Sequence, residues 1–327
     1  MAAAPFALVL AAACALLMGY AIQRGATCTV AAVGELVNER RARRLLALAE
    51  AALWVGGGLL LAQRLHMLPP MPAAGYAASA WTVGGGVLLG LGAWLGRACV
   101  FGAIARLGSG EWAYALTPLG FYAGCLSVGP LFAAAPPRPL HETSPVLQAP
   151  SWLAIGFVAF VAVRGATLLR GRAGWRTSVW QPHEATLVIG ASFLAMLLLV
   201  GAWAYTDVLA ELARGMSHSL PARTLLLLAL LAGAAWGGHS AGRWNGARPT
   251  GAQCLRCLVG GLLMGWGSLL IPGGNDGLIL VGMPLLWPYA WLAFASMCAS
   301  IAAALLLQRA AANLTFRSRV RDGRPGS

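Results

Sequence analysis

The sequence predicts an all-α, polytopic membrane protein of about nine spans, with additional short broken or re-entrant helices. Three observations predict this fold class. Of the 327 residues, 59% are hydrophobic and only 10% are charged, whereas soluble domains carry about 25% charged residues. Apolar runs long enough to cross a bilayer recur along the whole chain. Abundant glycine and tryptophan suit close helix packing and anchoring at the membrane interface.

The predicted spans are the apolar runs that approach the roughly 20 residues needed to cross a bilayer. In chain order they cover 5–22, 45–62, 79–97, 112–133, 151–168, 186–206, 222–240, 255–271 and 287–308. Three further apolar pieces, 26–37, 98–107 and 276–285, have about half that length. They indicate broken or re-entrant helices, which membranes tolerate only where protein or a cavity surrounds them.

Arginine placement predicts the orientation of these spans. The clusters are Arg40, Arg41, Arg43 and Arg44; Arg164, Arg170, Arg172 and Arg176; and Arg317, Arg319, Arg321 and Arg324. Short basic loops between apolar runs are typical of the cytoplasmic side of an inner membrane, and they argue against a nucleic-acid-binding face. We therefore expect a bacterial inner (plasma) membrane protein with the basic tail, 309–327, in the cytoplasm. Segments 134–150 and 207–221 would lie outside, the latter with a short amphipathic helix.

Glycines recur with one spacing in two distant parts of the chain. The first part reads Gly85-Gly86-x-x-x-Gly90-x-Gly92, with Gly102 following, and the second reads Gly260-Gly261-x-x-x-Gly265-x-Gly267, with Gly277 following. A weaker echo joins Gly19 and Arg24 to Gly238 and Arg243. By the orientation above, the two glycine-rich parts cross the membrane in opposite directions. The pattern predicts an inverted repeat, an architecture of transporters.

The predicted organisation is a single transmembrane domain over 1–327. Repeat one covers about 5–133, a linker span covers 151–206, and repeat two covers about 222–308. Superposing the glycines places Cys99 opposite Gly274. These two positions are the predicted centre of a pathway, where the N-termini of half-length helices offer free N–H groups to an anion.

At these residues the chain resembles the YeeE/YedE family of bacterial membrane proteins, which are described as sulfur-transport proteins. The matching stretches are Arg24-Gly25-Ala26-Thr27-Cys28, Gly96-Arg97-Ala98-Cys99-Val100-Phe101-Gly102-Ala103, Arg106-Leu107-Gly108-Ser109-Gly110, and Gly260 through Gly277. The resemblance implies an all-helical fold of two inverted halves. It also implies uptake of a small inorganic sulfur anion, with thiosulfate as the best example.

In that family, three cysteines line the path and are thought to pass the anion along through weak sulfur hydrogen bonds. Cys28 and Cys99 match the first two, whereas the third position here is Gly274. The resemblance and the glycine pattern together select the expected pathway residues, which are Cys28, Cys99, Gly274, Asn275 and Asp276. The expected supporting residues are Arg24, Arg97, Gly96, Gly102, Arg243, Gly273 and Gly277.

Each of these residues has a structural alternative. Cysteine packs well as a small apolar residue, and Asn275 or Asp276 could cap the helix that follows. The arginines beside the glycine motifs could attract an anion or extend to the membrane interface. Cys254-x-x-Cys257 resembles half of a metal or redox site, but no second pair accompanies it, and packing is the favoured interpretation.

The predicted function is a transporter or channel for a small inorganic sulfur anion in contact with membrane lipid. No nucleophile–base constellation, phosphate-binding loop or zinc spacing of histidines appears in the sequence, so we expect neither an enzyme nor a cofactor. One alternative is a membrane thiol protein that transfers sulfur with a cytoplasmic TusA-like sulfur carrier. Others are a permease for a different small solute and a structural subunit.

Overall fold

The computed structural model describes residues 5–68, 74–132, 137–170, 180–215, 220–246 and 248–321. Nearly all of this is helix, and one two-stranded antiparallel sheet pairs β1 (Gly75–Tyr76) with β2 (Pro139–Leu140). The helices are α1 (Pro5–Arg24), α2 (Thr29–Glu39), α3 (Arg43–Arg64), α4 (Ala80–Gly96), α5 (Val100–Gly108), η1 (Trp112–Ala115), α6 (Leu116–Phe132), α7 (Ser151–Arg170), α8 (Pro182–Val200), α9 (Tyr205–Ala213), α10 (Leu220–Ser240), α11 (Gly251–Leu270), α12 (Asn275–Gly277), the π-helical turn η3 (Leu278–Gly282) and α13 (Pro288–Arg321).

The all-α, polytopic fold is confirmed. Among the described residues, eight helical segments are long and apolar enough to cross a membrane. The remaining predicted span, 151–168, corresponds to α7, whose part Ser151–Thr167 counts as a shorter apolar helix. Leucine, valine and tryptophan side chains are exposed around the helices, as expected where lipid rather than water surrounds the protein.

The half-length pieces form short helices, as the sequence predicts. Pieces 26–37 and 98–107 become α2 and α5, and 276–285 becomes α12 with η3. The predicted span 186–206 is wrong in its second part. Helix α8 ends at Val200, residues 201–204 have no regular secondary structure, and α9 then begins. Gly201 has a φ of 90°, a backbone conformation that glycine adopts without strain.

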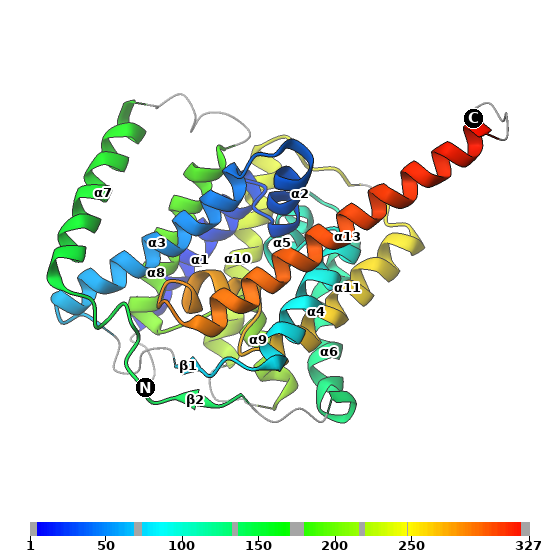
Figure 1. Cartoon of the computed structure of the whole chain (residues 1–327). Coiled ribbons are helices and arrows are strands. Elements are labelled where there is room, and N and C mark those ends of the chain that lie inside the picture. Colours follow the sequence, from blue (N-terminus) through cyan, green and yellow to red (C-terminus); the bar gives the residue numbers. More distant parts are fainter. Residues whose placement is uncertain are drawn as a thin grey trace.

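Two faces of the molecule can be distinguished in Figure 1. The link between α2 and α3 carries Arg40 and Arg41, and α3 starts with Arg43 and Arg44. This link lies at the same face as the C-terminal ends of α7 and α13. We call it the arginine face. The start of α1 and the β1–β2 pair lie at the opposite face, which we call the vestibule face. The predicted grouping of basic segments on one side therefore agrees with the packing.

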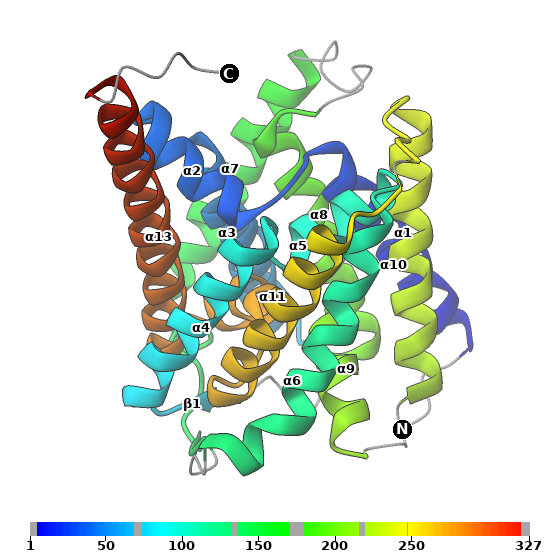
Figure 2. The ribbon, with the colours of Figure 1, turned by 90° about the vertical axis from the view of Figure 1, so that its right-hand side faces the viewer.

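The repeated glycines bring α4 and α11 into backbone contact (Figure 2). A Cβ atom on Gly92 would lie 2.6 Å from the carbonyl oxygen of Gly260, and one on Gly260 would lie 2.7 Å from that of Gly92. Gly85 and Gly267 meet in the same reciprocal way, at 2.8 and 2.6 Å. Contact of Gly85 with Gly267 and of Gly92 with Gly260 requires antiparallel helices. Because Gly85 corresponds to Gly260 in the repeat, and Gly92 to Gly267, the contact has the form of a two-fold interface.

Packing around this contact follows the same correspondence. Helix α6 packs on α11 as α13 packs on α4, and α10 packs on α1 as α3 packs on α8. The echo of Gly19 and Arg24 in Gly238 and Arg243 does not belong to this relation. Cβ atoms on Gly233 and Gly237 would meet the carbonyl oxygens of Leu16 and Tyr20, so α1 and α10 run in the same direction.

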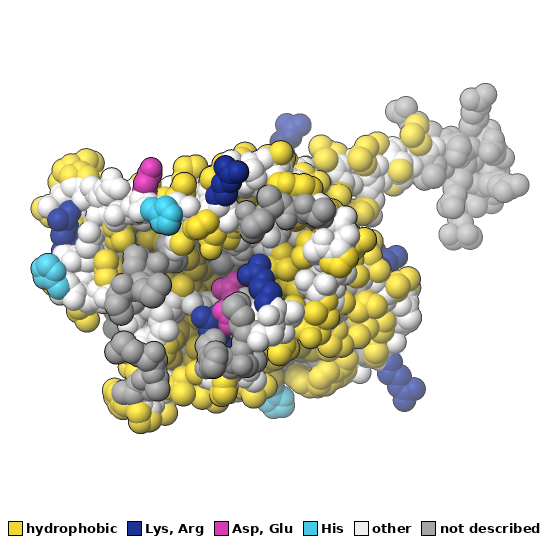
Figure 3. All heavy atoms as spheres, turned by 90° about the horizontal axis from the view of Figure 1, so that it is seen from below, with side chains coloured by type: hydrophobic (Ala, Val, Ile, Leu, Met, Phe, Trp, Pro, Cys, Tyr) yellow, Lys and Arg dark blue, Asp and Glu magenta, His cyan; other side chains and the backbone are white. Residues whose placement is uncertain are grey.

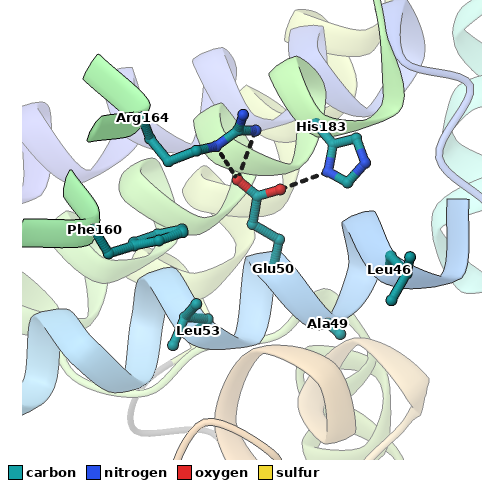
Figure 4. Close-up of a pocket in the computed structure, with 7 residues that line it drawn as sticks. All are labelled: Leu46, Ala49, Glu50, Leu53, Phe160, Arg164 and His183. Atoms are coloured by element: carbon teal, nitrogen blue, oxygen red, sulfur yellow. Dashed lines mark hydrogen bonds and ion pairs between the residues drawn. The ribbon is translucent and has the colours of Figure 1, made fainter. Parts of the chain in front are cut away.

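Helix α7 lies at the edge of the molecule (Figure 1) and is attached through a polar cluster (Figure 4). Arg164 of α7 donates to the Glu50 carboxylate of α3, with nitrogen–oxygen distances of 2.8 Å. The Nδ1 atom of His183 from α8 lies 2.5 Å from the other carboxylate oxygen. Trp54 also donates to Glu50, at 3.4 Å. The Phe157 ring of α7 fills the space that a side chain at Gly57 would take. One carboxylate therefore joins three helices.

We predict that Gly92→Ala destabilises the protein because the new methyl group forces α4 away from α11. An overpacked contact of this kind costs about 1 to 3 kcal/mol. The thermal unfolding midpoint of the purified protein in detergent measures the loss. Gly84→Ala, on the same helix, is the control because no atom lies within 4 Å of its Cβ position. Equal midpoints for the two variants would contradict the prediction.

We also predict that Glu50→Gln weakens the attachment of α7. The Arg164 guanidinium then loses its counter-ion in a half-buried site, and an unmatched charge of this kind costs about 1 to 3 kcal/mol. The measurement is again the unfolding midpoint in detergent, compared with that of Glu142→Gln, whose side chain is exposed. A midpoint unchanged from that of the control would show that the cluster contributes nothing.

Candidate functional site

Four short helices begin close to one another in the interior. Helices α2, α5, α9 and α12 start after Cys28, Cys99, Ala204 and Gly274, each in an extended conformation and none capping its own helix with its side chain. Helix α5 contacts both α2 and α12, and α12 contacts α9. The start of a helix presents N–H groups that have no acceptor within that helix. Acceptors for these groups must come from elsewhere in the protein.

The two predicted pathway thiols lie together. The Cys28 and Cys99 side chains are neighbours that interact electrostatically, and the N–H of Thr29 donates to the Cys99 sulfur at 3.1 Å. Gly102 borders this pair, because a Cβ there would lie 2.6 Å from the Cys28 sulfur. Cys99 is fully buried. The structure therefore brings together Cys28, Cys99 and Gly102 at the start of α2 and α5.

Asn275 connects three of the short helices. Its Oδ1 atom accepts the N–H of Val100, the first residue of α5, at 3.2 Å. Its Nδ2 atom donates to the Thr29 hydroxyl of α2 at 3.5 Å. Asn275 itself starts α12 and is fully buried. Asn275 could have capped the helix that it starts, but its side chain instead supplies an acceptor to a different helix, α5.

Asp276 serves α9 in a similar manner. Its carboxylate accepts the N–H of Thr206 at 3.2 Å and the Thr206 hydroxyl at 2.5 Å. Thr206 is the second residue of α9. Asp276 is only 2% exposed. The carboxylate therefore has the role toward α9 that the Cys99 sulfur has toward α2.

Gly274 occupies the position of the expected third cysteine, and the surrounding space is filled. A Cβ on Gly274 would lie 2.5 Å from the Thr206 hydroxyl oxygen and 2.8 Å from a carboxylate oxygen of Asp276. The preceding Gly273 has a φ of 116°, a conformation that turns the chain from α11 into α12 and that other residues rarely adopt. The glycine at 274 and the Thr206–Asp276 pair are therefore mutually dependent.

Cavities approach this centre from both faces. On the vestibule face a hollow of about 710 Å³ reaches Gly274, and we call it the vestibule. Its wall includes Asp207, Glu211 and Arg214, and Figure 3 shows acidic and basic side chains gathered in a hollow of this largely apolar face. On the arginine face a cavity of about 10 Å³, roughly one water molecule, lies between Cys28 and Arg44. Val100 and Asn275, fully buried, close the space between the two.

The vestibule wall carries an acid, Asp207, whose pKa is raised. Burial, reinforced by the nearby Asp276 carboxylate, raises the pKa of Asp207 to about 7. Helix α9, which carries Asp207, does not span the membrane. Charge on the vestibule wall therefore changes near neutral pH.

The supporting glycines lie around this centre. Gly96 closes α4 next to Gly260 of α11, with the nearest atoms at about 4 Å from its Cβ position. Gly277 lines the vestibule with Gly273. Glycine at 102 and 274 gives room to Cys28 and Thr206, as described above, whereas the space around a Cβ on Gly277 is open.

The predicted arginines are more dispersed. Arg24 is buried and its guanidinium lies 5.2 Å from the centre of the Tyr20 ring. Arg97 ends α4 in a left-handed conformation with an exposed side chain, and Arg243 follows the end of α10. A different residue, Arg106 of α5, interacts electrostatically with Cys28 and pairs with Glu111 at 3.2 Å. Its interaction with Cys28 makes it the better candidate for attracting an anion to the thiols.

The other cysteines occupy packed positions. Cys257 is buried in a small apolar cluster that Cys254 contacts, and Cys125 lies against the Gly265 carbonyl. In the part of the chain that the structure describes, no group of three His, Cys, Asp or Glu side chains is arranged to hold a metal ion.

Comparison with known families agrees with this arrangement. The sequence pattern of the sulphur transport family matches residues 24–303, which include all four short-helix starts. The chain belongs to this family, the YeeE/YedE sulfur transport family. Among curated proteins, none matches the sequence significantly. Membership of the sulphur transport family, together with the eight long apolar helices found among the described residues, identifies a multi-pass membrane protein of sulfur transport.

Several residues of this family member were absent from the sequence-based site. Thr206 and Tyr205 lie at the end of the predicted span 186–206, yet both are buried at the centre, where they start α9. The Tyr205 hydroxyl donates to the Val100 carbonyl at 3.4 Å. Thr29 follows Cys28 directly, and its position after a cysteine at the start of a half-length piece was the only available signal.

We predict that Gly274→Cys lowers the unfolding midpoint in detergent, because its Cβ collides with Thr206. Adding Thr206→Ala removes the colliding oxygen and should recover part of the loss, with a coupling of about 0.5 to 3 kcal/mol expected for residues in contact. Gly277→Cys is the control, since its Cβ position is open. Additive effects of Gly274→Cys and Thr206→Ala would contradict the proposed dependence.

Proposed function

We propose that the protein moves a small inorganic sulfur anion, such as thiosulfate, through the centre where the short helices meet. The observation that carries this proposal is the pair of contacting thiols, Cys28 and Cys99, at two helix starts between cavities from opposite faces. Partial positive charge at helix N-termini attracts anions. Sulfur is a weak hydrogen-bond donor and acceptor, so thiols hold an anion loosely enough to release it.

The proposed path runs from the vestibule past Gly274 and Asn275 to Cys99 and Cys28, and then to the arginine face near Arg106. We assign the arginine face to the cytoplasm of a bacterial inner membrane because basic segments concentrate there. The helix pairing supports two inverted halves, α1–α6 and α8–α13, with α7 as the linker. The second half would then begin at Pro182 rather than near residue 222.

A second candidate function is sulfur transfer, which the Cys28–Cys99 contact favours. The thiolate of one cysteine would attack the outer sulfur of thiosulfate, the sulfur–sulfur bond would break, and sulfite would leave. The sulfur on the resulting persulfide would then pass to a thiolate of a TusA-like carrier protein at the arginine face. A labelled persulfide on Cys28 or Cys99 after incubation with outer-labelled thiosulfate would favour this function over transport.

We predict that Cys28→Ser and Cys99→Ser each reduce thiosulfate uptake at least tenfold, which corresponds to about 1.4 kcal/mol. The harder, less polarisable hydroxyl binds its neighbours more strongly and alters the contact at Thr29. Uptake of labelled thiosulfate into proteoliposomes is the measurement, with Cys298→Ser of α13 as the control. Unimpaired uptake by both variants would reduce the two cysteines to packing residues, and no uptake by the wild type would point to another solute.

A further inference from the structure

Asp276 is a buried carboxylate without a basic partner. It is 2% exposed, and the N–H and hydroxyl of Thr206, which donate to it, are both neutral. The ion pairs found among the described residues do not include it. An ionisable residue at membrane depth is costly and marks a functional site more often than a structural one. If the only role of the side chain at 276 were to accept hydrogen bonds from Thr206, a neutral side chain would be enough.

Asp276 also lies where the vestibule ends. Its neighbours Gly274 and Gly277 line the vestibule, as does its partner Thr206. On the other side, the preceding Asn275 contacts Val100, and Val100 adjoins Cys99. An anion that leaves the vestibule for the thiols therefore has to pass the residues that hold the carboxylate.

The charges around Asp276 do not neutralise it. On α9, Asp207 adds negative charge and Tyr205 is neutral, and both interact electrostatically with Asp276. Glu211 of α9 pairs with Arg223 of α10, so the charge of Arg223 is already matched by Glu211. Cys99, which precedes α5, is a thiol. Tyr289 of α13 and Arg214 line the vestibule. Asp207, which interacts electrostatically with Asp276, is itself an acid.

An ionised carboxylate at this position would oppose the passage of an anion. Two like charges a few ångströms apart repel by several kcal/mol at the effective dielectric constant near a protein surface, and by more in the interior. Protonation removes the repulsion and converts the carboxyl group into a hydrogen-bond donor. Burial and like charge both favour the protonated form.

We propose that Asp276 is a proton-binding site that couples anion entry from the vestibule to the uptake of a proton. This inference rests on the proposed transport of an anion and adds its coupling ion. Because linkage is reciprocal, an anion that favours protonation of Asp276 is itself bound more tightly when the carboxyl is protonated. The anion and the proton then enter together, and a proton gradient drives accumulation of the anion.

The experiment uses the full chain in proteoliposomes with labelled thiosulfate. Uptake by the wild type should rise as the exterior is acidified at constant interior pH, by up to about tenfold per pH unit above the pKa of the coupling group. Asp276→Asn keeps the size of the side chain and an acceptor for Thr206 but cannot bind the proton. It should lose the response to pH, measured as the ratio of its own uptake at two exterior pH values. Glu142→Gln, on the exposed loop, should behave as the wild type.

The outcomes separate the two proposals. Absence of wild-type uptake under every gradient would overturn the transport function itself. Wild-type uptake with no response to a proton gradient, or with a response to a sodium gradient instead, overturns the proton site alone. A pH response that Asp276→Asn retains does the same. If that variant does not fold, a pH-sensitive dye outside lightly buffered wild-type vesicles decides the matter. Thiosulfate addition should make the exterior more alkaline, and a constant dye signal overturns the inference.

Discussion

The architecture depends on one constraint, that N–H groups at the start of a helix buried in a membrane protein need acceptors which water cannot supply. Here the acceptors come from other short helices. The Cys99 sulfur accepts from Thr29, the Asn275 oxygen from Val100, and the Asp276 carboxylate from Thr206. The free N–H groups at the start of one short helix are therefore bonded to acceptors at the start of another. The polar residues of the centre have a structural role before they have a chemical one.

The centre combines two kinds of chemistry in a framework that is close to symmetric. Corresponding helix starts carry thiols at Cys28 and Cys99 in the series α1–α6, and Ala204 and Gly274 in the series α8–α13. The second series instead contributes the oxygen and nitrogen atoms of Asn275, Asp276 and Thr206. An anion crossing the centre would meet buried oxygen and nitrogen atoms on the vestibule side and more polarisable sulfur atoms beyond them.

Much of the fold could be predicted because its signals are local. The glycine spacing predicts the inverted repeat that relates α4 to α11, and the half-length apolar pieces predict α2, α5 and α12. The break between α8 and α9 escapes prediction because Ala202, Trp203 and Ala204 continue the apolar run. The sequence places Cys28, Cys99, Gly274, Asn275 and Asp276 at the site, but Thr206 is 70 residues from its partner Asp276. No local pattern could join them.

Helix α7 makes few contacts and exposes most of its side chains, yet it determines how the rest can assemble. The series α1–α6 starts and finishes at the vestibule face, and α7 returns the chain to the arginine face before α8 begins (Figure 1). This single crossing reverses the second series relative to the first. With an even number of crossings in its place, α11 would run parallel to α4, and Gly85 could not meet Gly267 while Gly92 meets Gly260. A helix with few packing contacts thus determines whether the two series of helices run in opposite directions.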